Sequence, residues 1–136
     1  SGEIICGNGA AELFFAAVLA VRPKKALVCA PSFAEYARAL VASGADIRYY
    51  RLAQSDGYKV KEDILEEITK DIDMMFLCNP NNPTGELTDQ PLLLKILDKC
   101  RSCGVLLVLD ECFLDFLPKP HKYEMAGTRG AYPTCS

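Results

Sequence analysis

An acidic pair directly behind an apolar run is the first feature of this chain that could carry chemistry. Asp110 and Glu111 follow Val105–Leu109, a run typical of a strand buried on both faces of a parallel sheet. A carboxylate at the end of such a strand loses hydration, so Asp110 requires a cationic or hydrogen-bonding partner. Glu111 should point to the opposite side of the strand. Taken alone, the pair is also typical of metal ligands and structural carboxylates.

A proline-rich polar loop is the second candidate. It spans Asn79–Gly85 and follows the apolar run 74–78. Each of its two Asn-Pro steps disfavours helix, because proline restricts both its own φ and the residue before it. A buried strand is therefore predicted to end at a rigid polar loop, and ligands of α/β sheets bind at the carboxyl ends of strands. On these residues alone, an ordinary strand-to-helix turn is an equally good interpretation.

A run of small residues is the third candidate. The segment Cys6–Glu12 opens a helical pattern of apolar residues, namely Leu13, Phe14, Ala17, Val18 and Val21. Small residues at a helix start leave backbone N–H groups accessible to a phosphate. The run lacks the Gly-Lys-Ser/Thr of a Walker A loop and does not complete the Gly-x-Gly-x-x-Gly dinucleotide fingerprint. The run is therefore neither of these two nucleotide-binding motifs.

The elements that would position these groups alternate along the chain. Apolar runs and helical spacing predict strands over 26–30, 45–52, 74–78 and 105–109, and helices over 33–43, 61–70 and 90–103. Thr88 is a plausible N-cap for the last helix, and Gly104 ends it. Tyr36 is interpreted as a packing residue. Repeated strand–helix–strand units predict an α/β fold of three layers, with a mostly parallel sheet flanked by helices.

In this order and spacing, the three segments resemble the large domain of the fold-type I pyridoxal 5'-phosphate (PLP) enzymes, the class I/II aminotransferase family. The resemblance runs from Gly7 to about Phe116. The nearest branch contains histidinol-phosphate aminotransferase and threonine-phosphate decarboxylase. It implies an aminotransferase or decarboxylase that acts on an amino acid, with a phosphorylated one suggested by the branch. It also implies a homodimer.

The resemblance assigns cofactor contacts to six residues, which are Gly9, Ala10, Ala11, Phe33, Asn82 and Asp110. The first three bind the phosphate through backbone amides, and Phe33 stacks on the pyridine ring, whose plane a flat aromatic side chain can hold. Asn82 hydrogen-bonds the phenolic oxygen. Asp110 pairs with the protonated ring nitrogen, and this pairing favours the charged form that makes PLP an electron sink. All six are expected to converge at the carboxyl ends of the strands.

Two departures from the family pattern are visible. Phe113 stands where the family usually has a tyrosine that donates to the phenolic oxygen, and this favours the decarboxylase-like branch. The Schiff-base lysine would fall just past Ser136, so no catalytic residue is assigned within the chain. Residues 1–136 are therefore interpreted as a partial PLP-binding large domain, with 117–136 irregular and the catalytic-lysine segment and small domain absent. The alternative is a catalytically inactive truncated module kept for interaction, or a pseudogene product.

Composition and net charge exclude further classes of protein. The chain has 136 residues, a net charge of −3 and 50% hydrophobic residues, so neither a nucleic-acid partner nor disorder is expected. No apolar stretch reaches the length of a membrane span, and no signal peptide is expected. Seven cysteines, several in predicted strands, favour a reducing cytoplasm over a disulfide framework. The single C-x-x-C of Cys100 and Cys103 lacks a second pair, so no metal site is predicted.

Overall fold

A five-stranded parallel sheet forms the centre of the molecule. The computed structural model describes residues 4–7, 11–31, 34–79 and 88–110. The strands are β1 (Ile4–Gly7), β2 (Lys25–Ala30), β3 (Asp46–Arg51), β4 (Met74–Cys78) and β5 (Leu106–Asp110). They are ordered β1-β5-β4-β2-β3, and every pairing is parallel. This confirms the predicted α/β class.

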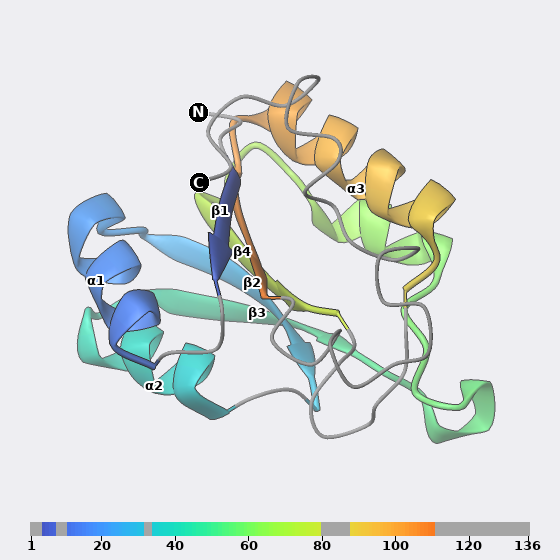
Figure 1. Ribbon diagram of the computed structural model, residues 1–136, viewed down its shortest axis with the longest axis horizontal. Coiled ribbons are helices and arrows are strands. Elements are labelled where there is room, and N and C mark those ends of the chain that lie inside the picture. The colour runs from blue at the N-terminus through green and yellow to red at the C-terminus, as the bar shows by residue number, and fades with distance from the viewer. Residues whose placement is uncertain (1–3, 8–10, 32–33, 80–87, 111–136) are drawn as a thin grey trace.

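Helices cover both faces of this sheet. α1 (Ala11–Val21) and α2 (Ala34–Ala42) lie on one side, and α3 (Gln90–Cys103) lies on the other with the short 3₁₀ helix η2 (Glu62–Glu67), as Figure 1 shows. A second short 3₁₀ helix, η1 (Gln54–Asp56), follows β3. The three predicted layers are therefore present, with the central strands enclosed between them.

The burial of each strand follows its position in the sheet. All five residues of β4 and all five of β5 are buried, as their uninterrupted apolar sequences predict. β3 pairs with β2 at the edge of the sheet, and all of its residues are exposed or half-buried. The carboxylate of Asp110 is thus carried into the interior by a central strand.

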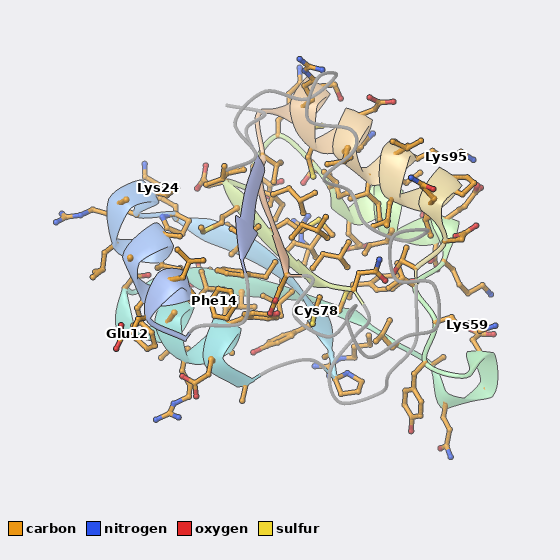
Figure 2. The ribbon with its side chains drawn as sticks, in the orientation of Figure 1. Glu12, Phe14, Lys24, Lys59, Cys78 and Lys95 are labelled. Atoms are coloured by element: carbon orange, nitrogen blue, oxygen red, sulfur yellow. The ribbon has the colours of Figure 1, made fainter. Side chains whose placement is uncertain are left out.

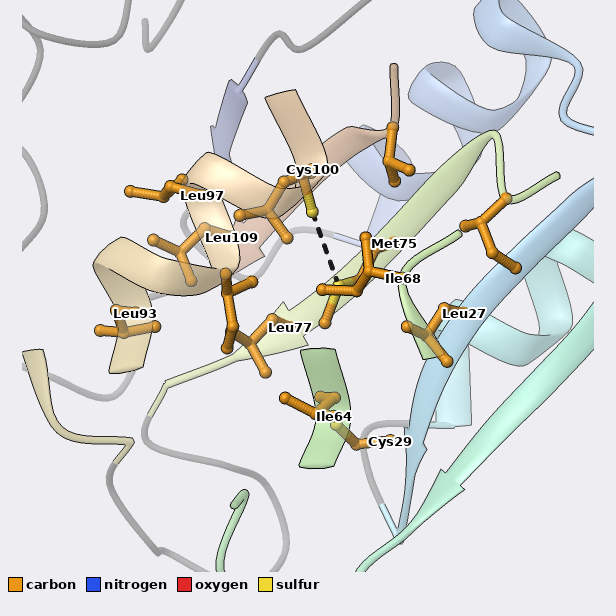
Figure 3. Close-up of a cluster of buried hydrophobic side chains, with 14 of the residues drawn as sticks. Leu27, Cys29, Ile64, Ile68, Met75, Leu77, Leu93, Leu97, Cys100 and Leu109 are labelled. Carbon is orange, nitrogen blue, oxygen red and sulfur yellow. Dashed lines mark hydrogen bonds between the residues drawn. The ribbon is translucent and has the colours of Figure 1, made fainter. Parts of the chain in front are cut away.

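Successive residues of a strand pack into two separate cores, one on each face of the sheet. The α3-side core is built from aliphatic and sulfur-containing side chains, among them Leu27, Ile64, Met75, Leu77, Leu93, Ile96, Cys100, Leu107 and Leu109, and Figure 3 shows its centre. The opposite core, here called the aromatic core, contains Phe14, Tyr36, Phe76, Val108 and their neighbours. Because side chains alternate along a strand, Leu107 and Leu109 enter one core while Val108 enters the other.

The segment 61–70 differs from its prediction as an α-helix. Only Glu62–Glu67 is helical, and it is a 3₁₀ helix that ends at Ile68, whose backbone is extended. Tertiary contacts meet the carbonyls at the end of this 3₁₀ helix. Arg48 Nη1 donates to the Glu67 carbonyl at 3.1 Å, and Cys103 Sγ lies 3.6 Å from the Ile68 carbonyl. Residues distant in sequence therefore contact the chain where the 3₁₀ helix ends, which local helix propensity does not reveal.

The ends of α3 also refine the prediction. Asp89, not Thr88, occupies the N-cap position, and no side-chain hydrogen bond caps the helix. Gly104 ends the helix as predicted, with a φ of 72° that glycine adopts without strain.

Cys100 of the C-x-x-C pair is buried in the α3-side core, and burial raises the pKa of its thiol to about 12. It therefore packs as a small apolar side chain.

Within the described part of the chain, no group of three His, Cys, Asp or Glu side chains is arranged to bind a metal ion. No helix among those residues is long and apolar enough to cross a membrane.

Candidate functional site

Three strands end side by side at the carboxyl edge of the sheet. In the ladder, Gly7 of β1 and Cys78 of β4 both lie opposite Asp110, the last residue of β5. This is the lower edge of the sheet in Figure 1, where α1 also begins. The segments that follow β1 and β4 therefore both start beside Asp110. Parallel strands bring residues distant in sequence to one edge, which is where ligands of such sheets bind.

Asp110 is buried and hydrogen-bonded at this edge. Its side chain is 1% exposed, and Tyr36 donates its hydroxyl to Oδ2 over 2.6 Å. Cys78 Sγ lies 4.0 Å from the same oxygen. A buried carboxylate requires a hydrogen-bonding partner, and α2 supplies it from a residue 74 positions earlier in the chain.

The hydroxyl of Tyr36 is held in place by aromatic packing. The Tyr36 ring stacks on Phe76 with centroids 4.8 Å apart, and it meets Phe14 edge-on at 4.9 Å. Figure 2 labels Phe14 on α1 and Cys78 at the end of β4. Burial above all, with Cys78 and Asp110 nearby, raises the pKa of Tyr36 far above its ordinary value. The hydroxyl therefore stays protonated and acts as a donor.

The prediction for Tyr36 was therefore incomplete. The residue is fully buried and does pack, as expected, but it also contacts the candidate carboxylate. A signal was present in the sequence. Asp110 required a donor, and Tyr36 places a hydroxyl on the apolar face of α2 that also carries Ala39 and Leu40. Sequence periodicity could place it in a core but not beside a particular strand end.

Asn79 is a second residue whose role the sequence did not reveal. It is fully buried, and its backbone N–H donates to the Asp110 carbonyl at 2.8 Å. Its Oδ1 accepts a hydrogen bond of 2.8 Å from the Thr88 backbone N–H. Asn79 thus joins Thr88, the residue on the other side of the segment 80–87, to the end of β5. Its Nδ2 is buried without a hydrogen-bond partner among the described residues.

The six predicted cofactor contacts are only partly within the described residues. Asp110 is at the edge just described, and Ala11 is the first residue of α1. The other four, Gly9, Ala10, Phe33 and Asn82, lie outside the described residues, as do Glu111 and Phe113. The convergence of all six therefore stays a prediction.

Comparison with known proteins places the chain in a family. The family described as aminotransferase class I and II matches residues 1–133. The chain belongs to this family. The resemblance read from the three segments is therefore confirmed.

Two curated relatives extend this result. The chain is 47% identical over 115 residues to a threonine-phosphate decarboxylase of Salmonella typhimurium, covering 85% of this chain and 32% of that protein. It is 34% identical over 125 residues to a histidinol-phosphate aminotransferase of Listeria monocytogenes, covering 90% of this chain and 34% of that protein. The chain spans about a third of the length of the curated relatives it matches.

Solved structures have the same fold. The histidinol-phosphate aminotransferase from Clostridium acetobutylicum superposes with a TM-score of 0.78 at 22% identity, over 95% of this chain and 37% of that one. A PLP-bound C-S lyase from Staphylococcus hominis gives a TM-score of 0.68 at 24% identity, over 76% of this chain and 28% of that one. At these identities the likeness concerns the fold.

Proposed function

We propose that the chain forms the PLP-binding part of an amino-acid decarboxylase or aminotransferase. The observation that carries this proposal is the buried carboxylate of Asp110 at the carboxyl edge, with Tyr36 donating to it. A buried carboxylate suits a protonated pyridine nitrogen, because the two charges stabilise each other where water is excluded. The PLP-bound state of a structural neighbour supports the same assignment.

Different residues of this chain would contact different parts of PLP. Asp110 accepts the N–H of the ring nitrogen and keeps the proton on it. The backbone of Gly9, Ala10 and Ala11 binds the phosphate at the start of α1, where the helix dipole and the first N–H groups favour an anion. Phe33 holds the ring plane and Asn82 donates to the phenolic oxygen. When bound, PLP supplies the electron sink for a carbanion at the substrate α-carbon.

A phosphorylated amino acid is the proposed substrate class. The identity to threonine-phosphate decarboxylase is higher than that to histidinol-phosphate aminotransferase, 47% against 34%, and this favours decarboxylation over transamination. Both names carry a phosphate ester. The proposal also includes a cytoplasmic location and a homodimer with the family's active site at its interface. Light scattering of the purified chain tests the dimer.

Binding of a PLP analogue tests the cofactor site. Pyridoxine 5'-phosphate has the ring and phosphate of PLP but an alcohol in place of the aldehyde, so it cannot modify lysines. We expect saturable binding in titration calorimetry, weakened roughly tenfold or more by Asp110→Asn. Asp63→Asn is the matched control, because Asp63 is an exposed aspartate that also accepts from a tyrosine, Tyr50. Equal affinity of wild type and Asp110→Asn would contradict the proposal.

Turnover is a separate question from binding. No lysine within residues 1–136 is assigned to the covalent link with the cofactor aldehyde, so we expect no turnover by this chain alone. Incubation with PLP, borohydride reduction and mass spectrometry test this expectation. A stable adduct on one specific lysine would contradict it and would weaken the alternative of an inactive module.

A further inference from the structure

A tyrosine hydroxyl that donates to a buried carboxylate offsets the energetic cost of burying that charge, and it can also fix the orientation of the carboxylate. We propose that Tyr36 is a positioning residue, which orients Asp110 and keeps the proton of the Asp110–cofactor pair on the ring nitrogen. The inference rests on the proposed function, because it assigns Tyr36 a role toward the same bound group. It assigns no new contact to the cofactor itself, since Tyr36 acts through Asp110.

Geometry supports a positioning role. The 2.6 Å distance from the Tyr36 hydroxyl to Asp110 Oδ2 is typical of a hydrogen bond to an ionised oxygen. The ring that carries the hydroxyl stacks on Phe76 and meets Phe14 edge-on. Both of these residues are fully or almost fully buried. The donor is thus held by the aromatic core, and Asp110 is oriented before any ligand arrives.

The location of the shared proton follows from the same contact. A carboxylate and a pyridine nitrogen compete for one proton when they share a hydrogen bond. A donor to the carboxylate stabilises its ionised form, so the proton remains on the nitrogen. Without the Tyr36 hydroxyl, the buried Asp110 would retain less stabilisation of its charge. The proton would then shift toward Asp110, and the ring would be a poorer electron sink.

The chain contains a natural control for this pair. Tyr50 donates to Asp63 Oδ1 at 2.5 Å, and this pair lies at the surface. Tyr36→Phe and Tyr50→Phe each remove one tyrosine hydroxyl from one aspartate. Only Tyr36 contacts the aspartate at the carboxyl edge of the sheet, and Tyr50→Phe also removes an acceptor of the Lys61 backbone N–H. A general effect of losing a tyrosine–aspartate hydrogen bond should appear in both variants.

The experiment uses pyridoxine 5'-phosphate labelled with ¹⁵N in the ring. Bound to the wild-type chain at neutral pH, the ring nitrogen should give the ¹⁵N shift of a protonated pyridine. In Tyr36→Phe we expect the signal to move toward that of an unprotonated pyridine, with affinity about tenfold weaker. Tyr50→Phe should leave both signal and affinity unchanged. Replacing Tyr36 with 4-aminophenylalanine, a weaker donor of the same shape, should give an intermediate shift.

The outcomes separate the inference from the proposed function. If Tyr36→Phe binds with the wild-type signal and affinity while Asp110→Asn loses both, the positioning role is wrong and the cofactor site stands. If the wild-type chain does not bind the ligand, the proposed function itself fails. If Tyr36→Phe loses affinity but keeps the protonated signal, the hydroxyl does not hold the proton on the ring nitrogen and the inference is overturned. The 4-aminophenylalanine variant keeps the aromatic shape, so it serves as the test should Tyr36→Phe not fold.

Discussion

The two faces of the sheet are each covered by a buried apolar core, and the two cores differ in chemistry. The fully buried members of the α3-side core are all aliphatic or sulfur-containing, and Tyr50 and Tyr58 pack against them as half-buried residues. The aromatic core stacks Phe14, Tyr36 and Phe76 and meets a buried carboxylate at its carboxyl edge. Both faces are filled by alternate residues of the same strands, such as Leu109 and Asp110. One face therefore stabilises the fold, and the other both stabilises it and holds the candidate site.

Phe76→Ala tests whether the aromatic core serves both purposes. Phe76 is almost fully buried and stacks on Tyr36. We expect a loss of about 3–5 kcal/mol in the free energy of unfolding, together with weaker binding of pyridoxine 5'-phosphate because Tyr36 loses its support. Urea unfolding and calorimetry measure the two effects. Unchanged affinity in the folded fraction would show that this packing does not position the site.

Ile96→Ala makes the corresponding change in the α3-side core. Ile96 is fully buried on α3, and we expect a loss of about 2–5 kcal/mol in the free energy of unfolding. Ligand affinity, measured under conditions where the variant is folded, should stay at the wild-type value. An affinity loss as large as that of Phe76→Ala would remove the functional distinction between the two faces.

Asn79→Ala tests the connection between β4, β5 and the segment 80–87. The variant leaves the buried N–H of Thr88 without its acceptor, which we expect to cost about 1–3 kcal/mol of stability. It also frees the two ends of the segment that carries Asn82, so ligand affinity should fall. Gln90→Ala, an exposed change at the start of α3, is the control. A thermal melt and calorimetry would detect either effect, and wild-type values in both would refute the role.

The smallest effect on stability is expected for Asp71, which forms an ion pair with Lys25, the first residue of β2. Asp71 is exposed, and hydrogen bonds from Thr69 and Lys25 lower its pKa to about 2. Because the folded-state pKa lies below the ordinary value, the stabilisation is present above about pH 4 and is lost as the pH falls toward 2. Asp71→Asn should remove that pH dependence, shift the melting temperature slightly and leave ligand affinity unchanged. The shift should shrink in high salt.

Much of the sheet could be predicted from local sequence. The apolar runs 74–78 and 105–109 indicated central strands because hydrophobic residues on both faces suit only a covered sheet. The need of Asp110 for a partner followed from the energy of burying a charge. The extent of the helix at 61–70 did not follow, because Arg48 and Cys103, both distant in sequence, contact the carbonyls at its end.

By itself, the sequence determined the α/β alternation, the carboxylate at a buried strand end and the polar segments that signal the family. These follow from short-range patterns of apolar residues, glycine and proline. Only the tertiary structure decided which donor meets Asp110, and that Asn79 joins Thr88 to the end of β5. Tyr36 reaches Asp110 because α2 packs on the face into which alternate residues of β5 point, and that face depends on how strands and helices far apart in sequence assemble.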